Sequence, residues 1–232
     1  DLLEPLCRPS DCSVLALTGL GLAWLQMSEW EEARAVSRRA LEKRPTEEAA
    51  RLHLMRAELE LGAFAEVVNE FHRLSEPTRA SAQAANLAGQ ALLGLTRPVE
   101  CLKLLAALAA RPDATAELLC TVGRAEVEQG RPGEAAAFFE RALRLTPEDV
   151  ELWRLLGRAR AALEQHSAAS DCFVRATTLR PSDAELHFER GRHEQLNGSL
   201  SQALASFERG LELCDTNALA QLHAAECAIR LE

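Results

Sequence analysis

The hydrophobic residues of this chain recur every three or four positions over stretches of about a dozen residues, and short polar segments separate these stretches. Residues 150–163 show the pattern clearly, with apolar side chains at Leu152, Leu155, Leu156 and Ala159. After a break at 164–167, a second stripe runs through residues 168–179. This spacing places apolar side chains on one helical face, so it predicts two amphipathic helices joined by a short turn.

The same arrangement returns every 34 residues. Glycines keep this interval, with Met55 in the one vacant slot, at Gly21, Gly89, Gly123, Gly157 and Gly191. Prolines agree in register at Pro45, Pro147 and Pro181. The register divides the chain, without insertion or deletion, into six units at 14–47, 48–81, 82–115, 116–149, 150–183 and 184–217. A seventh unit begins at Ala218.

Small and large residues alternate within each unit for a steric reason. Gly157, Ala169 and Ala176 allow two helix backbones to approach closely, and large side chains fill the space beside them, namely Trp153, Leu156, Phe173 and Leu179. One helical hairpin cannot bury both of its faces, so each must stack on its neighbour.

The period of 34 residues, with Trp-x-x-Leu-Gly, Ala, Phe, Ala and Pro in order, resembles the tetratricopeptide repeat, TPR, over residues 14–232. The resemblance implies an all-α, right-handed solenoid of antiparallel helix pairs. Residues 1–13 are then a lead-in or the remnant of a preceding repeat, and 218–232 a capping helix or the start of a seventh repeat. The second and third units are degenerate, so we expect wider helix spacing there. Because the chain begins with Asp1, we expect a segment of a longer protein.

The composition agrees with a helical protein and argues against nucleic-acid-binding and membrane-spanning proteins. Tyr is absent and the sequence is rich in strong helix formers. The net charge of −9 argues against general nucleic-acid binding, which needs a basic face. No apolar run is long and charge-free enough to span a bilayer, and no signal peptide is visible.

Seven cysteines are scattered without a C-x-x-C pair, which favours buried thiols in a reducing compartment and so a cytoplasmic protein. Two short-range disulfides stay open as alternatives, Cys7–Cys12 and Cys214–Cys227.

The sequence carries no pattern typical of an enzyme. A glycine-rich phosphate loop, G-x-S-x-G, H-E-x-x-H and a paired-cysteine metal site are all absent. His187 and His193 lie six residues apart, on different faces of a helix, and are interpreted as solvated surface residues. Cys101 and Cys172 fall on the inward stripe of second helices. We therefore predict no catalytic residues, no metal and no cofactor.

The resemblance implies that the second, fifth, ninth and twelfth residues of each first helix line a concave groove. The candidate partner-binding residues at these positions are Arg56, Gln83, Asn86, Gln90, Arg124, Arg154, Arg158, Phe188 and Arg192. Repeated guanidinium groups can clamp carboxylates or main-chain carbonyls, and amides can hold a peptide backbone. The alternative is that each arginine pairs with a nearby glutamate, such as Glu117, Glu151 or Glu185, and only keeps the groove soluble.

The resemblance implies a protein–protein interaction scaffold or adaptor that binds an extended or helical partner segment, and the arginines suggest a segment that is acidic over units four to six. Chaperone-tail binding is disfavoured, because Lys43 and Lys103 both fall in second helices. Two other function classes stay open. One is a regulatory or substrate-presenting domain of a larger enzyme, and the other is a scaffold that self-associates through its apolar first units or an open repeat end.

Overall fold

The computed structural model describes residues 13–231, and these residues form α-helices in tandem without a strand. The chain divides into two compact units, Asp1–Ala114 and Thr115–Glu232, called here the N-terminal and C-terminal units. The expected lead-in therefore lies, apart from Ser13, outside the described residues, as does the Cys7–Cys12 pair.

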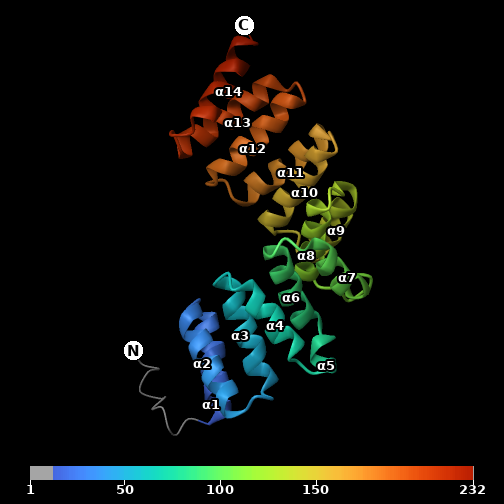
Figure 1. Cartoon of the computed structure of the whole chain (residues 1–232). Coiled ribbons are helices and arrows are strands. Elements are labelled where there is room, and N and C mark those ends of the chain that lie inside the picture. The colour runs from blue at the N-terminus through green and yellow to red at the C-terminus, as the bar shows by residue number, and fades with distance from the viewer. Residues whose placement is uncertain (1–12, 232) are drawn as a thin grey trace. The chain divides into compact units, whose positions relative to one another are not determined.

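Within each unit, helices follow one another in chain order as stacked antiparallel pairs (Figure 1). The N-terminal unit contains α1 (Val14–Gln26), α2 (Trp30–Lys43), α3 (Glu48–Glu60), α4 (Phe64–His72), α5 (Glu76–Arg79), α6 (Ala82–Gly94) and α7 (Pro98–Ala109). The C-terminal unit contains α8 (Ala116–Glu128), α9 (Pro132–Leu145), α10 (Val150–Ala162), α11 (His166–Leu179), α12 (Ala184–Leu196), α13 (Leu200–Leu213) and α14 (Ala218–Ile229). The fold is an all-α solenoid.

The first helices begin at 34-residue intervals because the residue before each one is usually a capping residue. Its side-chain oxygen accepts a hydrogen bond from a backbone N–H of the first turn at Ser13, Ser81, Thr115, Asp149, Asp183 and Asn217. Only Glu47, before α3, makes no such bond. These caps satisfy N–H groups that the helix itself leaves unpaired.

The turn inside each helix pair is equally periodic. One residue of every turn has a positive φ, and these residues are Ser28, Gly62, Thr96, Gly130, Glu164 and Gly198. Glycine adopts this left-handed conformation without cost, whereas Ser28, Thr96 and Glu164 adopt it against their steric preference. The turn geometry is therefore imposed by the packing of the two helices, and not by glycine alone.

Close contact between a glycine and a phenylalanine holds the two helices of each C-terminal pair together. A Cβ placed on Gly157 would lie 2.9 Å from the Phe173 ring, and one on Gly191 would lie 3.0 Å from Phe207. Both phenylalanine rings are fully buried. The predicted pairing of small and large residues is confirmed here, but Leu179 is 40% exposed, so its predicted place in the core is wrong.

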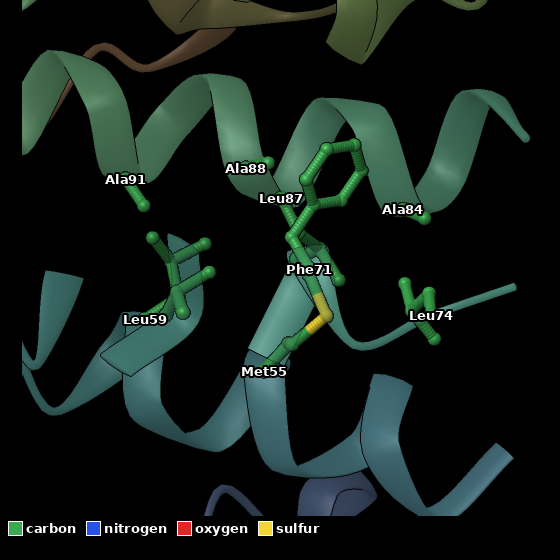
Figure 2. Packing of buried hydrophobic residues seen from close by; sticks show 9 residues of the cluster. Met55, Leu59, Phe71, Leu74, Ala84, Leu87, Ala88 and Ala91 are labelled. Atoms are coloured by element: carbon green, nitrogen blue, oxygen red, sulfur yellow. The ribbon is translucent and has the colours of Figure 1, made fainter. Parts of the chain in front are cut away.

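In the second repeat, Met55 takes the glycine slot and is completely buried. It belongs to a core cluster that also contains Leu59, Phe71 and Leu87. Figure 2 shows the Phe71 ring reaching toward α6, which carries Leu87. A flexible thioether fills the irregular space that a glycine would leave here.

The second repeat also departs from the predicted two helices. Helix α4 ends at His72, and the one-turn helix α5 contains Pro77, which cannot donate a backbone hydrogen bond to continue α4. Glu48 of α3 holds the start of α5, because its carboxylate accepts hydrogen bonds from the Ser75 backbone N–H at 2.8 Å and from the Thr78 hydroxyl. The wider helix spacing expected here stays a prediction.

Candidate partner-binding face

The structure exposes most of the positions predicted to line a groove. At the second position of the first helices, Leu15, Ala49, Gln83, Glu117, Glu151 and Glu185 are all exposed. At the ninth position, Leu22, Arg124, Arg158 and Arg192 are exposed, and Arg56 and Gln90 are half-buried. The fifth position is more buried, because it lies closer to the helix–helix contact.

In the C-terminal unit these positions form a surface that we call the arginine face, made of Arg124, Arg154, Arg158 and Arg192 on α8, α10 and α12. The exposed glutamates of the second position precede the ninth-position arginines by seven residues. Seven residues span about 10 Å of helix, so the carboxylates and guanidiniums form separate rows. This separation explains why the structure shows no ion pair between them among residues 13–231.

Two arginines of the face instead converge on one buried carboxylate. Arg154 donates to Glu189 Oε1 from Nη2 at 2.8 Å and from Nε at 3.1 Å, and Arg158 also donates to Oε1. The Glu189 side chain is only 7% exposed. Burial by itself raises the pKa of this carboxyl, but hydrogen bonds from both arginines outweigh burial and lower the pKa below its usual value.

Some of the candidate groove arginines therefore pair with glutamates, as the alternative expects, but their partners are not Glu117, Glu151 or Glu185. Arg154 and Arg158 use Glu189, and Arg56 pairs with Glu60 at 3.0 Å. Arg124 and Arg192 are exposed and form no ion pair with any residue in the described range 13–231. Their guanidinium groups keep full capacity for a carboxylate from another molecule.

Two predicted groove residues belong to the interior. Phe188 is 4% exposed and packs against Gly210 of α13, in a core cluster with Phe207 and Ala203. Asn86 is 5% exposed inside α6. Both occupy the fifth helix position, where the face meets the helix–helix contact, and neither side chain is available to a partner in this structure.

The N-terminal unit presents a different surface at the same positions. Leu15 is 82% exposed and Leu22 is 46% exposed on α1, whereas Gln83 and Gln90 of α6 offer amides. The exposed or half-buried groove positions of this unit therefore carry apolar side chains on α1 and amides on α6.

The apolar residues of the terminal helix were not among the partner-binding candidates predicted from the sequence. On α14, the second, fifth and twelfth positions are Leu219, Leu222 and Ile229, which are 53%, 54% and 71% exposed. The 34-residue register carried through to residue 218 was a sufficient signal, because it places these residues at the second, fifth and twelfth positions predicted to line the groove.

The thiols and imidazoles of the described residues do not form a reactive centre. Burial raises the pKa of the Cys120 thiol to about 11, and burial also raises the pKa of Cys172. A thiol with a raised pKa is a poor nucleophile at neutral pH. Cys214 and Cys227, an alternative disulfide pair, are both free.

Of the two histidines interpreted as solvated, His187 is buried and His193 is half-buried. His187 is 7% exposed, and its Nε2 lies 3.1 Å from the Pro181 carbonyl oxygen. His193 stacks on the Phe173 ring at 5.1 Å between centroids, and burial lowers its pKa. In the described part of the chain, no three His, Cys, Asp or Glu side chains gather as metal ligands would.

Comparison with known proteins agrees with this architecture. The tetratricopeptide repeat family model matches residues 126–190. Within this segment the chain therefore matches the sequence pattern of tetratricopeptide repeats. A sequence search of curated proteins finds no match.

Solved structures resemble the repeats over nearly the whole chain. PilW, described as a widely conserved type IV pilus biogenesis factor, superposes with a TM-score of 0.80 at 19% identity, over 92% of this chain and 99% of PilW. PilF of Pseudomonas aeruginosa gives 0.76 at 18% identity, over 92% of this chain and 97% of PilF. A chain of the APC/C hetero-tetramer Cut9-Hcn1 gives 0.78 at 16% identity over 97% of this chain, which spans 44% of that protein.

At these identities the likeness concerns the fold. A tetratricopeptide-repeat fold supports a protein–protein interaction scaffold in general, since stacked repeats create an extended surface for a partner. No helix among residues 13–231 has the length and apolar character needed to cross a membrane.

Proposed function

We propose that this chain is a non-enzymatic interaction module whose arginine face binds an extended or helical segment of another protein, with an acidic stretch over α8, α10 and α12. The observation that carries the proposal is that Arg124 and Arg192 are exposed without an ion-pair partner in the described residues. Between them in the sequence, Arg154 and Arg158 are fixed by Glu189, so their orientation is already set before a partner arrives.

Arg154 and Arg158 offer a partner both positive charge and guanidinium groups of fixed orientation. Each arginine uses part of its guanidinium on Glu189, and Arg158 remains 51% exposed. A guanidinium has five N–H donors, so the donors that Glu189 leaves free can still bind a partner's carboxylate or main-chain carbonyl. The exposed apolar residues of α14, Leu219, Leu222 and Ile229, would contact apolar side chains that flank the acidic stretch.

The experiment that tests this proposal uses fluorescent peptides of alternating Glu and Ser, with matched Gln and Ser peptides as neutral references. We expect the chain to bind the acidic peptides more tightly, and the difference to decrease as salt screens the charges. The variant Arg124→Glu/Arg158→Glu/Arg192→Glu should lose this binding.

A matched control keeps the change in net charge but places it elsewhere in the C-terminal unit. Arg144, Arg175 and Arg209 are exposed residues of second helices, so Arg144→Glu/Arg175→Glu/Arg209→Glu should retain most of the binding. If the two triple variants bind acidic peptides equally, the arginine face is not the site. Circular dichroism would check that both variants remain folded.

A regulatory or substrate-presenting domain of a larger enzyme is the second candidate. Its support is that this chain spans 44% of the Cut9-Hcn1 chain that it resembles, so a similar array of repeats occurs as part of a longer protein. We further propose a reducing, cytoplasmic location, supported by the thiols of Cys120, Cys172, Cys214 and Cys227, which form no disulfide within the described residues.

A further inference from the structure

The N-terminal unit contains a cavity of about 460 Å³ between α2, α3 and α4. On α3 it is lined by Arg51, Leu54 and Glu58. These residues lie about 150° around the helix from Leu52 and Arg56, which occupy the groove positions. The cavity therefore lies on a different side of the repeats from the groove positions of α3.

Three arginines line the cavity, and each already has a carboxylate partner. Arg38 Nη2 donates to Glu58 Oε1 at 2.8 Å. Arg51 and Arg73 both donate to Glu70, the latter at 2.7 Å. Glu58 and Glu70 thus offset two of the three arginine charges, and one positive charge is left before the other carboxylates of the cavity are counted.

The two remaining carboxylates of the cavity have no arginine partner among the described residues. Glu42 and Glu66 also line it, and neither forms an ion pair with another residue of the described chain. With all groups ionised, four glutamates face three arginines, so the cavity carries one net negative charge. Charge complementarity therefore favours a cationic ligand.

Glu58 is the decisive residue, because it is only 2% exposed and one of its oxygens is unsatisfied. Its Oε1 accepts from Arg38, but Oε2 has no hydrogen-bond partner within residues 13–231. Burial raises the pKa of this carboxyl. A buried acceptor without a donor is costly, and a ligand that brings N–H groups and positive charge removes that cost.

We propose that this cavity binds the guanidinium side chain of an arginine from a protein partner. A planar guanidinium can donate to several carboxylate oxygens at once, and Glu42, Glu58 and Glu66 supply them. Leu41 and Leu54 form an apolar wall for the aliphatic part of the same side chain. The volume lies within the range of small-ligand sites, roughly 300–1,000 Å³.

The test is a titration of the isotopically labelled full chain with Nα-acetyl-arginine amide, followed by two-dimensional NMR. The neutral isostere Nα-acetyl-citrulline amide serves as the reference ligand. We expect saturable shifts of backbone amides in α2, α3 and α4, with a dissociation constant in the millimolar range. The citrulline ligand should bind at least ~10-fold more weakly, because it lacks the charge that the carboxylates recognise. Shifts that do not saturate, or equal shifts with both ligands, would overturn the proposal.

Two variants locate the binding. Glu42→Gln/Glu66→Gln removes exposed charges at the cavity and should weaken arginine binding about 5-fold or more. The matched control Glu128→Gln/Glu134→Gln removes two exposed charges from the C-terminal unit and should leave binding unchanged. Equal weakening in both variants would show a general charge effect and sink the assignment.

Binding of an arginine side chain at the cavity does not require the arginine face. Arg124→Glu/Arg158→Glu/Arg192→Glu should bind Nα-acetyl-arginine amide as the wild type does, with the same amides shifted. Failure of one site is therefore distinguishable from failure of the other.

Discussion

Trp153 donates its indole N–H to the carbonyl oxygen of Pro147 over 2.8 Å. Three other repeats place a nitrogen of a different side chain at the same helix position against the equivalent carbonyl. The pairs are Arg51 with Pro45 at 2.5 Å, His187 with Pro181 at 3.1 Å, and Gln221 with Asp215 at 2.7 Å. The fourth residue of the first helix thus ties the repeat to the turn before it, and an N–H group matters more than the identity of the side chain.

Replacing Trp153 by Phe should keep an aromatic ring but remove this hydrogen bond. We expect the free energy of unfolding to decrease by about 1 kcal/mol, because the Pro147 carbonyl loses its donor. Urea denaturation followed by circular dichroism measures the change. Trp24→Phe is the matched control, since the Trp24 indole makes no hydrogen bond within residues 13–231. Equal losses in the two variants would mean that ring size, and not the hydrogen bond, is responsible.

Gly123→Ala should destabilise the first helix pair of the C-terminal unit. The added methyl group would lie 2.5 Å from Phe139 Cε1, and this ring is fully buried. We expect a loss of about 1–3 kcal/mol in the free energy of unfolding, as for other overpacked cores. Gly133→Ala is the control, because a Cβ there meets nothing within 4 Å, and it should be neutral or slightly stabilising. A loss in both variants would point to backbone conformation instead of the Phe139 contact.

Thr96→Gly should stabilise the protein. Thr96 has a φ of +56°, a left-handed conformation that a β-branched residue adopts at a cost, whereas Gly130 occupies the equivalent place with a φ of +70°. We expect a gain of about 1 kcal/mol from Thr96→Gly and a loss of similar size from Gly130→Ala. Thermal unfolding of both variants measures the two effects. A Thr96→Gly variant less stable than the wild type would show that the left-handed residue is not strained.

Two buried glutamates should give opposite pH dependences of stability. The pKa of Glu58 is raised in the folded protein, mainly by burial. Its contribution is therefore greatest at low pH and is lost as the pH rises from the unfolded value of about 4.3 through the raised value. The pKa of Glu189 is lowered, because the hydrogen bonds from its two arginines outweigh burial. Its contribution is present at neutral pH and is lost as the pH falls through the lowered value.

The isosteric variants Glu58→Gln and Glu189→Gln measure this difference. As the pH rises from about 3 to 7, Glu58→Gln should gain stability relative to the wild type, and Glu189→Gln should lose it, mostly below about pH 5. Urea midpoints at each pH provide the comparison. Parallel trends in the two variants would contradict the opposite directions of the two pKa shifts.

The pairing of charges across repeats shows what the sequence could and could not predict. Arg38 pairs with Glu58 at 2.8 Å, and Glu140 pairs with Arg160 at 3.0 Å. Each pair joins the same two positions of successive repeats, with the signs exchanged. Comparing positions across the 34-residue register could have found this reversal. No local pattern could have done so, because each pair is separated by 20 residues.

The partner of Arg154 and Arg158 was missed for a related reason. Glu189 is 35 and 31 residues away, and it reaches both guanidiniums only because α10 and α12 stack in consecutive repeats. The sequence instead suggested Glu151, which is three and seven residues from the same arginines. Helical geometry excludes Glu151 for Arg158 but leaves it within reach of Arg154, whose choice of partner depends on rotamers and on burial at the contact between repeats.

The sequence by itself determined the repeat: its period, the starts of its helices and its caps. These features depend on contacts within a few residues of the chain, such as the oxygen of Asp149 that accepts from the Leu152 N–H. Only the tertiary structure decided which predicted groove residues stay exposed, since Arg192 lies on the surface and Phe188 lies in the core. It also placed Glu42, Glu58 and Glu66 around one cavity. Burial and long-range ion pairs depend on how neighbouring helices pack, and that packing joins residues that no local periodicity connects.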